Sequence, residues 1–146
     1  MIEGIDQLNR QLMSLERNAS KKIARGAVTR GTRPALQAVK TNAKSMVGGE
    51  MGALMAANLK SRTWKKPPKS MYAKAIVFKP DVKEFVHESK AGKRSYIPSA
   101  IEHGHGNAAP IPYMRTAFNQ TRQTSLQTIT NELRSGILKE VKSVGK

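Results

Sequence analysis

Three side chains of types that bind metals lie close together in the sequence, at Glu102, His103 and His105. A carboxylate and two imidazoles are ordinary zinc ligands. The chain has no cysteine, and the third histidine, His87, does not complete a recognised ligand spacing. The two neighbouring histidines flank Gly104, whereas helical zinc motifs place their histidines at positions i and i+4. The pattern therefore favours a polar turn over a metal site, and we expect no metal and no cofactor.

The residues that serve as nucleophiles in enzymes do not form a known motif in this chain. No serine lies in a Gly-x-Ser-x-Gly sequence, and Gly48-Gly49 is not followed by the Gly-Lys-Ser/Thr of a P-loop. The absence of cysteine excludes thiol nucleophiles, thiolate zinc sites and disulfides. The sequence therefore predicts a protein that is not an enzyme.

A basic segment at about residues 61–70 is the best local candidate for binding a polyanion. Trp64 lies there beside two consecutive prolines and among four cations, Arg62, Lys65, Lys66 and Lys69. A flat aromatic ring beside cations can stack on exposed bases while the cations hold the phosphate backbone. An alternative is that Trp64 fills the core, because tryptophan is well buried on average. The sequence predicts an exposed loop or extended arm and leaves both interpretations of Trp64 open.

The whole chain is strongly basic, with 26 Lys and Arg residues against 10 Asp and Glu and a formal net charge of +16. Between residues 17 and 80 there are fifteen basic residues and one acid, Glu50. Such a charge attracts nucleic acid, anionic lipid headgroups or an acidic protein surface, and composition alone does not choose among them. Further candidate contacts lie on the helix expected over residues 20–46, namely Arg25, Arg30, Arg33 and Lys40.

The length of 146 residues fits a single domain, residues 1–146. No apolar run approaches the roughly 20 residues that span a bilayer, and the N-terminal sequence lacks the basic-then-apolar pattern of a signal peptide. We therefore expect a protein that is made in the cytosol and has no membrane partner.

Helical periodicity predicts helices at about residues 3–17, 20–46, 51–59 and 113–141. Gly31 and Pro34 predict a kink, or two separate helices, near residues 31–33. Pro112 fits the start of the last helix. The apolar stripe expected on that helix consists of Phe118, Leu126, Ile129, Leu133, Ile137 and Val141.

Aromatic and β-branched residues predict strands at about 72–78 and 96–102, paired as an antiparallel unit with a long insertion. In the first strand we expect Ala73, Ala75 and Val77 to face inward. Residues 81–92 are expected to form a connection that contains a helical turn. The predicted fold class is α+β, with long kinked amphipathic helices packed on a small antiparallel sheet and with a long C-terminal helix.

Several short motifs follow one another in a specific order along the chain. Tyr96 precedes Glu102-His103-Gly104, and then comes Pro110-Ile111-Pro112-Tyr113-Met114-Arg115-Thr116-Ala117-Phe118. Upstream, residues 27–43 contain Gly31, Pro34 and Asn42-Ala43, and Met51-Gly52-Ala53-Leu54 follows. This order resembles the tail-completion or neck family of long-tailed bacteriophages. The chain departs from the usual family pattern at Lys44, Met51 and Tyr113, where proline, threonine and phenylalanine are commoner.

The resemblance implies a structural virion protein that completes the tail or neck and joins head to tail, by forming or docking on a ring around the DNA channel. It implies other neck and tail ring proteins as partners, a homo-oligomeric ring, and non-specific contact with double-stranded DNA. The location would be the neck of the virion, and the host cytoplasm during assembly. The matching residues would be scaffold groups, namely Gly31, Pro34, Gly52, Leu54, Glu102, Gly104, Pro112, Arg115 and Phe118. The alternative function is a sequence-independent nucleic-acid-binding protein.

Overall fold

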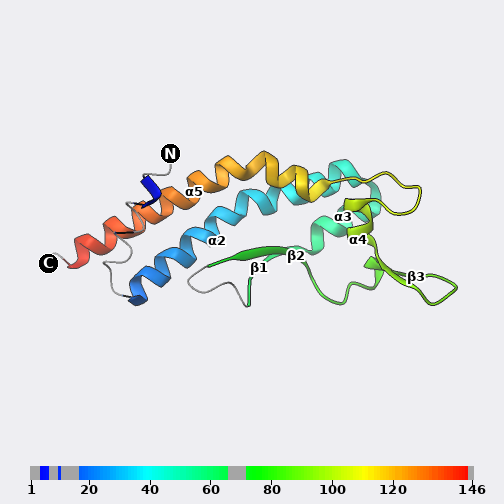
Figure 1. Cartoon of the computed structure of the whole chain (residues 1–146), viewed down its shortest axis with the longest axis horizontal. Coiled ribbons are helices and arrows are strands. Elements are labelled where there is room, and N and C mark those ends of the chain that lie inside the picture. The colour runs from blue at the N-terminus through cyan, green and yellow to red at the C-terminus, as the bar shows by residue number, and fades with distance from the viewer. Residues whose placement is uncertain (1–3, 7–9, 11–16, 66–71, 145–146) are drawn as a thin grey trace. The chain divides into compact units, whose positions relative to one another are not determined.

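The computed structural model describes residues 4–6, 10, 17–65 and 72–144. It is mostly helical, and Figure 1 shows the order of its elements. They are α2 (Arg17–Asn42), the π-helical turn η1 (Ala43–Val47), α3 (Gly49–Asn58), β1 (Leu59–Thr63), β2 (Lys74–Phe78), the 3-10 turn η2 (Lys83–Phe85), β3 (Val86–Glu88), β4 (Arg94–Tyr96), α4 (Ile97–His103) and α5 (Tyr113–Val144). The predicted α+β class and the long C-terminal helix are confirmed. Most of the helix predicted at 3–17 lies outside the described residues.

The chain divides into two compact units, each built from segments that are distant in the sequence. Unit 1 consists of residues 1–34, 63–75 and 123–146, and unit 2 consists of residues 35–62 and 76–122. Among the described residues, no helix is both long enough and apolar enough to cross a membrane.

In unit 1, the N-terminal part of α2 lies alongside the C-terminal part of α5, as Figure 1 shows. Small residues allow this close approach, because a Cβ atom at Gly31 would clash with Ile129 and one at Gly136 would lie 2.7 Å from Ile23 Cγ2. Ile137 is buried in the same unit, with 3% of its surface exposed. Each helix therefore contributes a glycine to the contact, Gly31 from α2 and Gly136 from α5.

The hydrophobic core of unit 2 is formed by side chains from helices, turns and strands together. Its buried members are Val39, Ala43, Met55, Ala56, Leu59, Phe85, Tyr113 and Ala117. Ile76 and Phe78 of β2 pack against this core, which places the inward face of β2 opposite to the predicted one. The prediction failed because residues on both faces of this strand are apolar, so alternation alone did not select a face.

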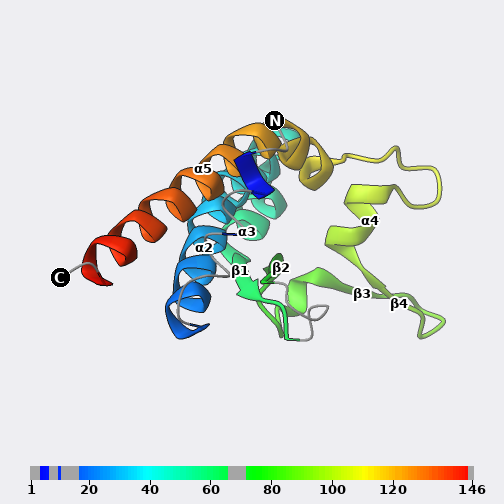
Figure 2. The same cartoon turned by 60° about the vertical axis from the view of Figure 1, so that its left-hand side comes forward.

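Each of the two sheets has two strands, and the predicted pairing of residues 72–78 with 96–102 is wrong. β2 pairs with β1, and β4 pairs with β3. Hydrogen bonds from Trp64 N to Ala73 O and from Lys79 N to Asn58 O fit an antiparallel register for the first pair. In the second pair, Val86 lies opposite Tyr96 and Glu88 opposite Arg94. Figure 2 shows this β3–β4 hairpin next to α4.

Residues 97–102, predicted as a strand, belong to the short helix α4. Pro98 lies in its first turn, where a proline has no backbone donor to lose and its fixed φ suits the helix. The segment predicted as an exposed arm at 61–70 also begins differently, because residues 61–63 complete β1. Residues 66–70 of that segment lie outside the described residues.

A kink or two separate helices were predicted near residues 31–33, and the second alternative is wrong, because α2 runs as one α-helix from Arg17 to Asn42 with Pro34 inside it. An interior proline costs about 3 kcal/mol. Gly31 and Ala35 on either side are buried, so packing on both sides offsets that cost. The irregular turn comes later, at η1, and is followed by Gly48 with a φ of 72°.

The apolar stripe predicted for the last helix is only partly buried. Phe118, Leu126 and Val141 are exposed, whereas Ile137 is buried and Ile129 is half-buried. The buried positions nearer the start of α5 are Tyr113 and Ala117. The predicted stripe was wrong at the exposed positions because glycine and alanine residues make much of the actual contact. A pattern based on large apolar side chains does not select these small residues.

Candidate polyanion-binding site

A pocket of about 550 Å³ in unit 1 brings one turn of α2 next to the paired ends of β1 and β2. The α2 turn contributes Arg25, Val28 and Thr29, and the strand ends contribute Thr63, Trp64, Lys65, Tyr72, Ala73 and Lys74. This pocket is the place where the basic segment predicted from the sequence meets the basic helix.

Local hydrogen bonds and a ring contact hold the walls of the pocket. The Trp64 N–H donates to Ala73 O at 3.0 Å, which ties the two strand ends together. The Arg25 guanidinium carbon lies 5.5 Å from the centre of the Tyr72 ring, within the range of a cation–π contact. The Thr29 hydroxyl donates to Arg25 O at 2.7 Å. Arg25 is thereby placed against the aromatic wall of the pocket.

The pocket is positively charged and has an accessible aromatic surface. Arg25, Lys65 and Lys74 line it, and the described lining residues include no carboxylate. Trp64 is 57% exposed, so the interpretation that it fills the core is wrong. An exposed indole beside three cations suits a ligand that offers phosphates together with flat bases.

The structure separates the other predicted contact residues from this pocket. Arg30 forms an ion pair with Glu132, and Arg33 is exposed on α2. Lys40 lines a pocket of about 430 Å³ in unit 2 together with Lys44, and Arg62 lines a different groove of unit 2. Lys66 and Lys69 lie outside the described residues.

Sequence reasoning missed Tyr72 and Lys74, which belong to the pocket. Both lie on the far side of the proline-containing segment from Trp64. A prediction that residues 59–63 and 74–78 pair would have brought them to Trp64. The signal was weak because Lys60, Ser61 and Arg62 are polar and the strand they form is short.

Among the residues that carry the family resemblance, Glu102 has the clearest structural role. Its side chain is buried, and its two oxygens accept hydrogen bonds from Met114 N at 2.9 Å and Arg115 N at 3.0 Å. These donors lie in the first turn of α5, where backbone N–H groups have no partner within the helix. Glu102 therefore caps α5 from α4, and its negative charge suits the positive end of the helix dipole.

The neighbouring Tyr113 is also buried, and its hydroxyl donates to Pro98 O at 3.2 Å. Burial, and next the charge of Glu102, raise the pKa of this phenol well above its ordinary value. Asn42 Nδ2 donates to Tyr113 O at 3.2 Å, which joins α2 to the start of α5 within unit 2. The start of α5 is thus fixed by contacts from two other helices.

Tight backbone packing surrounds three of the motif glycines. Gly104 has a φ of 79°, and a Cβ atom there would lie 2.9 Å from Ala108 O. A Cβ atom at Gly52 would clash with Ala43 O, just as one at Gly31 would clash with Ile129. Only glycine fits these places without a shift of the backbone or of a neighbouring side chain.

The remaining motif residues have varied environments. Leu54 packs on the core of unit 2, Pro34 lies inside α2, and the Pro112 carbonyl accepts a hydrogen bond from Thr116 N at 3.0 Å. Arg115 has an exposed side chain. The expectation that Phe118 helps to aim the last helix needs correction, because Phe118 is 48% exposed and the buried Tyr113 and Ala117 make the packing contacts.

The structure gives no support to the metal hypothesis within the part of the chain that it describes. There, no group of three or more histidine, cysteine, aspartate or glutamate residues is placed to hold a metal ion. His103 and His105 are exposed, and both oxygens of Glu102 bind backbone N–H groups.

Comparisons of this chain with models of known protein families, with curated proteins and with solved structures found no match.

Proposed function

We propose that this chain is a structural virion protein of a tailed bacteriophage, which completes the tail or neck and joins head to tail. The observation that carries the proposal is the link between two parts of the family-like sequence. The Glu102 carboxylate binds the N–H groups of Met114 and Arg115, so residues that recur together in the motif are joined in space. A motif whose members hold one another in place is what a scaffold role requires.

The proposed mechanism is assembly by association, without a chemical step. Copies of the chain form or join a ring around the DNA channel, with other neck and tail ring proteins as partners. The net charge of +16 steers and orients docking, and buried apolar contacts hold the assembled state. The basic pocket around Trp64 faces DNA or an acidic subunit in this arrangement.

Electron microscopy of phage particles assembled without this chain tests the proposal. Filled heads accumulating beside separate tails are the expected result, and restoring the chain from a plasmid should rejoin them. Normal, infectious particles in the absence of the chain would contradict the proposal.

A second candidate function, sequence-independent binding of nucleic acid by the free protein, is favoured by the exposure of Trp64 beside Arg25, Lys65 and Lys74. Trp64 is the single tryptophan of the chain, so its fluorescence reports directly on the pocket. Titration with duplex and single-stranded oligonucleotides should quench this fluorescence with an affinity that falls steeply as salt rises.

The two candidates differ in that titration. A neck protein needs only weak DNA binding in free solution, because a ring multiplies weak contacts, whereas a dedicated binding protein must bind as a free chain. Replacing Arg25 with glutamine should weaken binding, and the matched control Lys22→Gln, also exposed on α2, should change it less. Fluorescence that does not change with oligonucleotide would remove the second candidate.

A further inference from the structure

A second groove, of about 660 Å³, lies in unit 2 between the loop after β2 and the β3–β4 hairpin. We call it the aromatic groove, since Phe78, Phe85 and Tyr96 line it together with the aliphatic side chains of Val82 and Val86. Its size is within the range of pockets that bind small ligands.

The three rings of the aromatic groove form one cluster. Their centres are 5.0 Å apart for Phe78 and Phe85, 6.2 Å for Phe85 and Tyr96, and 6.4 Å for Phe78 and Tyr96, all with edge-to-face geometry. Phe85 is buried, which anchors the cluster in the core of unit 2. The floor of the groove is therefore a fixed apolar surface.

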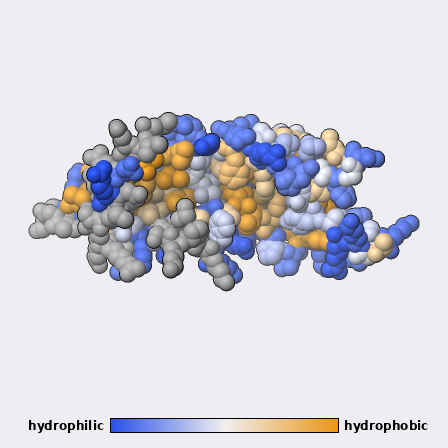
Figure 3. All heavy atoms as spheres, in the orientation of Figure 1, coloured by the Kyte–Doolittle hydropathy of each residue, from blue (hydrophilic) through white to orange (hydrophobic). Residues whose placement is uncertain are grey.

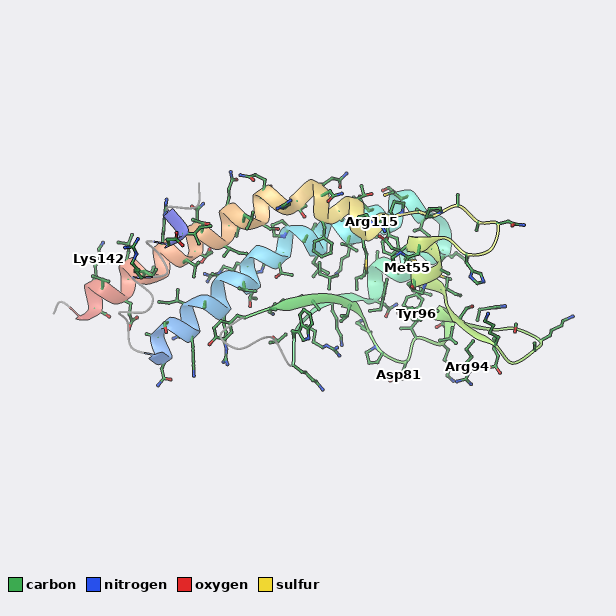
Figure 4. All side chains as sticks on the ribbon, viewed as in Figure 1. Met55, Asp81, Arg94, Tyr96, Arg115 and Lys142 are labelled. Carbon is green, nitrogen blue, oxygen red and sulfur yellow. The ribbon has the colours of Figure 1, made fainter. Side chains whose placement is uncertain are left out.

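Part of this apolar surface is open to solvent. Tyr96 is 44% exposed and Val86 is 46% exposed, and the two residues lie opposite each other in the β3–β4 pair. An aromatic and a β-branched residue in such a pair usually stabilise a sheet by facing a core. Figure 3 shows apolar surface beside hydrophilic surface over this hairpin, and Figure 4 shows Tyr96 near Asp81 and Arg94.

The rim of the aromatic groove is positively charged. Arg94 and Glu88 pair with each other at 3.1 Å, so their charges largely cancel. The other charged lining residues are Arg62, Lys79 and Lys83 against Asp81, which leaves a net charge of +2. An apolar floor with a cationic rim is complementary to an apolar side chain with carboxylates beside it.

We propose that the aromatic groove binds an extended segment of a different protein, in which one aromatic or long aliphatic side chain is flanked by acidic residues. The apolar side chain occupies the floor beside Tyr96 and Val86, and the flanking carboxylates meet Arg62, Lys79 and Lys83. The inference does not depend on the proposed function, and it holds for any cellular or viral partner with this chemistry.

Two other occupants fit the groove less well. Nucleic acid would find little exposed ring face on which to stack a base, because the three rings pack edge-to-face on one another. A second copy of this chain would bring more positive charge, because the chain has 26 basic and 10 acidic residues. An acidic segment of another protein meets neither objection.

Fluorescence anisotropy with a labelled peptide tests the proposal. The probe is Gly-Ser-Asp-Glu-Asp-Phe-Asp-Glu-Asp-Ser-Gly, with one companion peptide that has alanine in place of phenylalanine and another that has lysine in place of every acid. The first peptide should bind, and the alanine companion should bind at least about tenfold more weakly, since burial of one large apolar side chain is worth that much or more. The lysine companion should also bind more weakly, because its cations meet the cationic rim of the groove.

Matched variants locate the binding. Lys79→Glu with Lys83→Glu should abolish most of the binding, whereas Lys90→Glu with Lys93→Glu makes the same change of net charge at exposed positions outside the groove and should leave most of it. Tyr96→Ser should weaken binding of the phenylalanine peptide. Leu138→Ser changes an exposed apolar residue of unit 1 and should leave that binding unchanged. Circular dichroism of each variant verifies that it folds.

The proposal is overturned if the phenylalanine peptide does not bind at about 1 mM, a concentration that detects even weak complexes. It is also overturned if the alanine peptide binds equally well, or if both lysine pairs matter equally. A duplex oligonucleotide that binds with the same dependence on Tyr96 and Lys79 would assign the groove to nucleic acid instead. None of these results bears on whether heads and tails join, so the two proposals fail separately.

Discussion

At the scale of single residues, the first turn of α5 is held by two buried side chains, the carboxylate of Glu102 and the phenol of Tyr113. Glu102 binds two backbone donors of this turn, and Tyr113 reaches back to the carbonyl of Pro98 in α4. These bonds join α4 to α5 across the loop that contains Gly104. A substitution at either residue should therefore affect the stability of unit 2 directly.

Glu102→Gln should lower the free energy of unfolding by about 1–3 kcal/mol, because a charged acceptor is lost from two buried N–H groups and an amide N–H₂ is placed against one of them. Urea unfolding followed by circular dichroism measures the change. Glu84→Gln, at an exposed position of η2, is the control and should stay within about 0.5 kcal/mol of the wild type. Equal stability of the two variants would show that the cap contributes little.

Tyr113→Phe should destabilise the protein by about 1 kcal/mol at neutral pH, through loss of the hydrogen bond to Pro98. Burial raises the pKa of Tyr113 in the folded state above its ordinary value of 10.0. Above that pH the unfolded chain releases the phenolic proton while the folded chain keeps it, so wild-type stability falls by up to about 1.4 kcal/mol per pH unit from this group.

The phenylalanine variant lacks this dependence, so the difference between the two proteins should shrink as the pH rises from 9 to about 11. Urea unfolding of both proteins across this range measures it. Curves that remain parallel would mean that the phenol of Tyr113 titrates alike in the folded and unfolded chains.

At the scale of elements, two glycines of α2 have opposite environments in the same unit. Gly31 is buried against α5, whereas an added Cβ atom at Gly26 meets nothing within 4 Å. Glycine inside a helix costs about 0.5–1 kcal/mol relative to alanine unless packing requires it. The two positions therefore separate intrinsic helix preference from packing.

Gly26→Ala should stabilise the protein by about 0.5–1 kcal/mol, through helix propensity alone. Gly31→Ala should destabilise it by about 1–3 kcal/mol, because the new methyl group displaces Ile129 and approaches the Ser125 carbonyl at 3.2 Å. Thermal unfolding compares the two variants. Changes of the same sign would show that α2 and α5 do not pack through Gly31.

At the scale of the whole molecule, the net charge of +16 governs long-range attraction, and the pocket around Trp64 adds local contacts. If the pocket is a binding site, removing its cations should change the salt dependence of DNA binding more than removing cations from elsewhere on the surface. Each phosphate contact contributes about 0.9 to the slope of log affinity against log salt concentration.

The triple variant Arg25→Gln, Lys65→Gln, Lys74→Gln should reduce that slope for duplex DNA by up to about 3. The control triple variant Lys22→Gln, Lys90→Gln, Lys139→Gln removes the same charge from exposed positions outside the pocket and should reduce it less. Anisotropy of labelled duplex DNA between 50 and about 200 mM salt measures both slopes. Identical slopes for the two variants would mean that the pocket has no special role in binding.

Predictions of helices from the sequence were accurate where the local pattern was long. Residues 113–141 were expected as a helix and lie in α5, and Pro112 comes directly before α5. The helix expected at 51–59 is α3, which ends at Asn58, and Leu59 begins β1. The strand expected at 72–78 is present as β2 (Lys74–Phe78), whereas the strand expected at 96–102 is wrong beyond Tyr96, because Ile97-Pro98 and the residues after them suit a short strand and a short helix equally well. The strand β1 was missed because Lys60, Ser61 and Arg62 give it a polar sequence.

By itself, the sequence determined the positive charge, the absence of thiol chemistry, the long helices and the motifs on which the phage resemblance rests. These properties depend on residue types and on neighbours within a few turns of helix. Only the tertiary structure decided that Trp64 is exposed beside Arg25 and Tyr72, that Glu102 caps α5, and that Tyr96 and Val86 line one groove. Each of these depends on contacts between different elements of structure, which local periodicity does not encode.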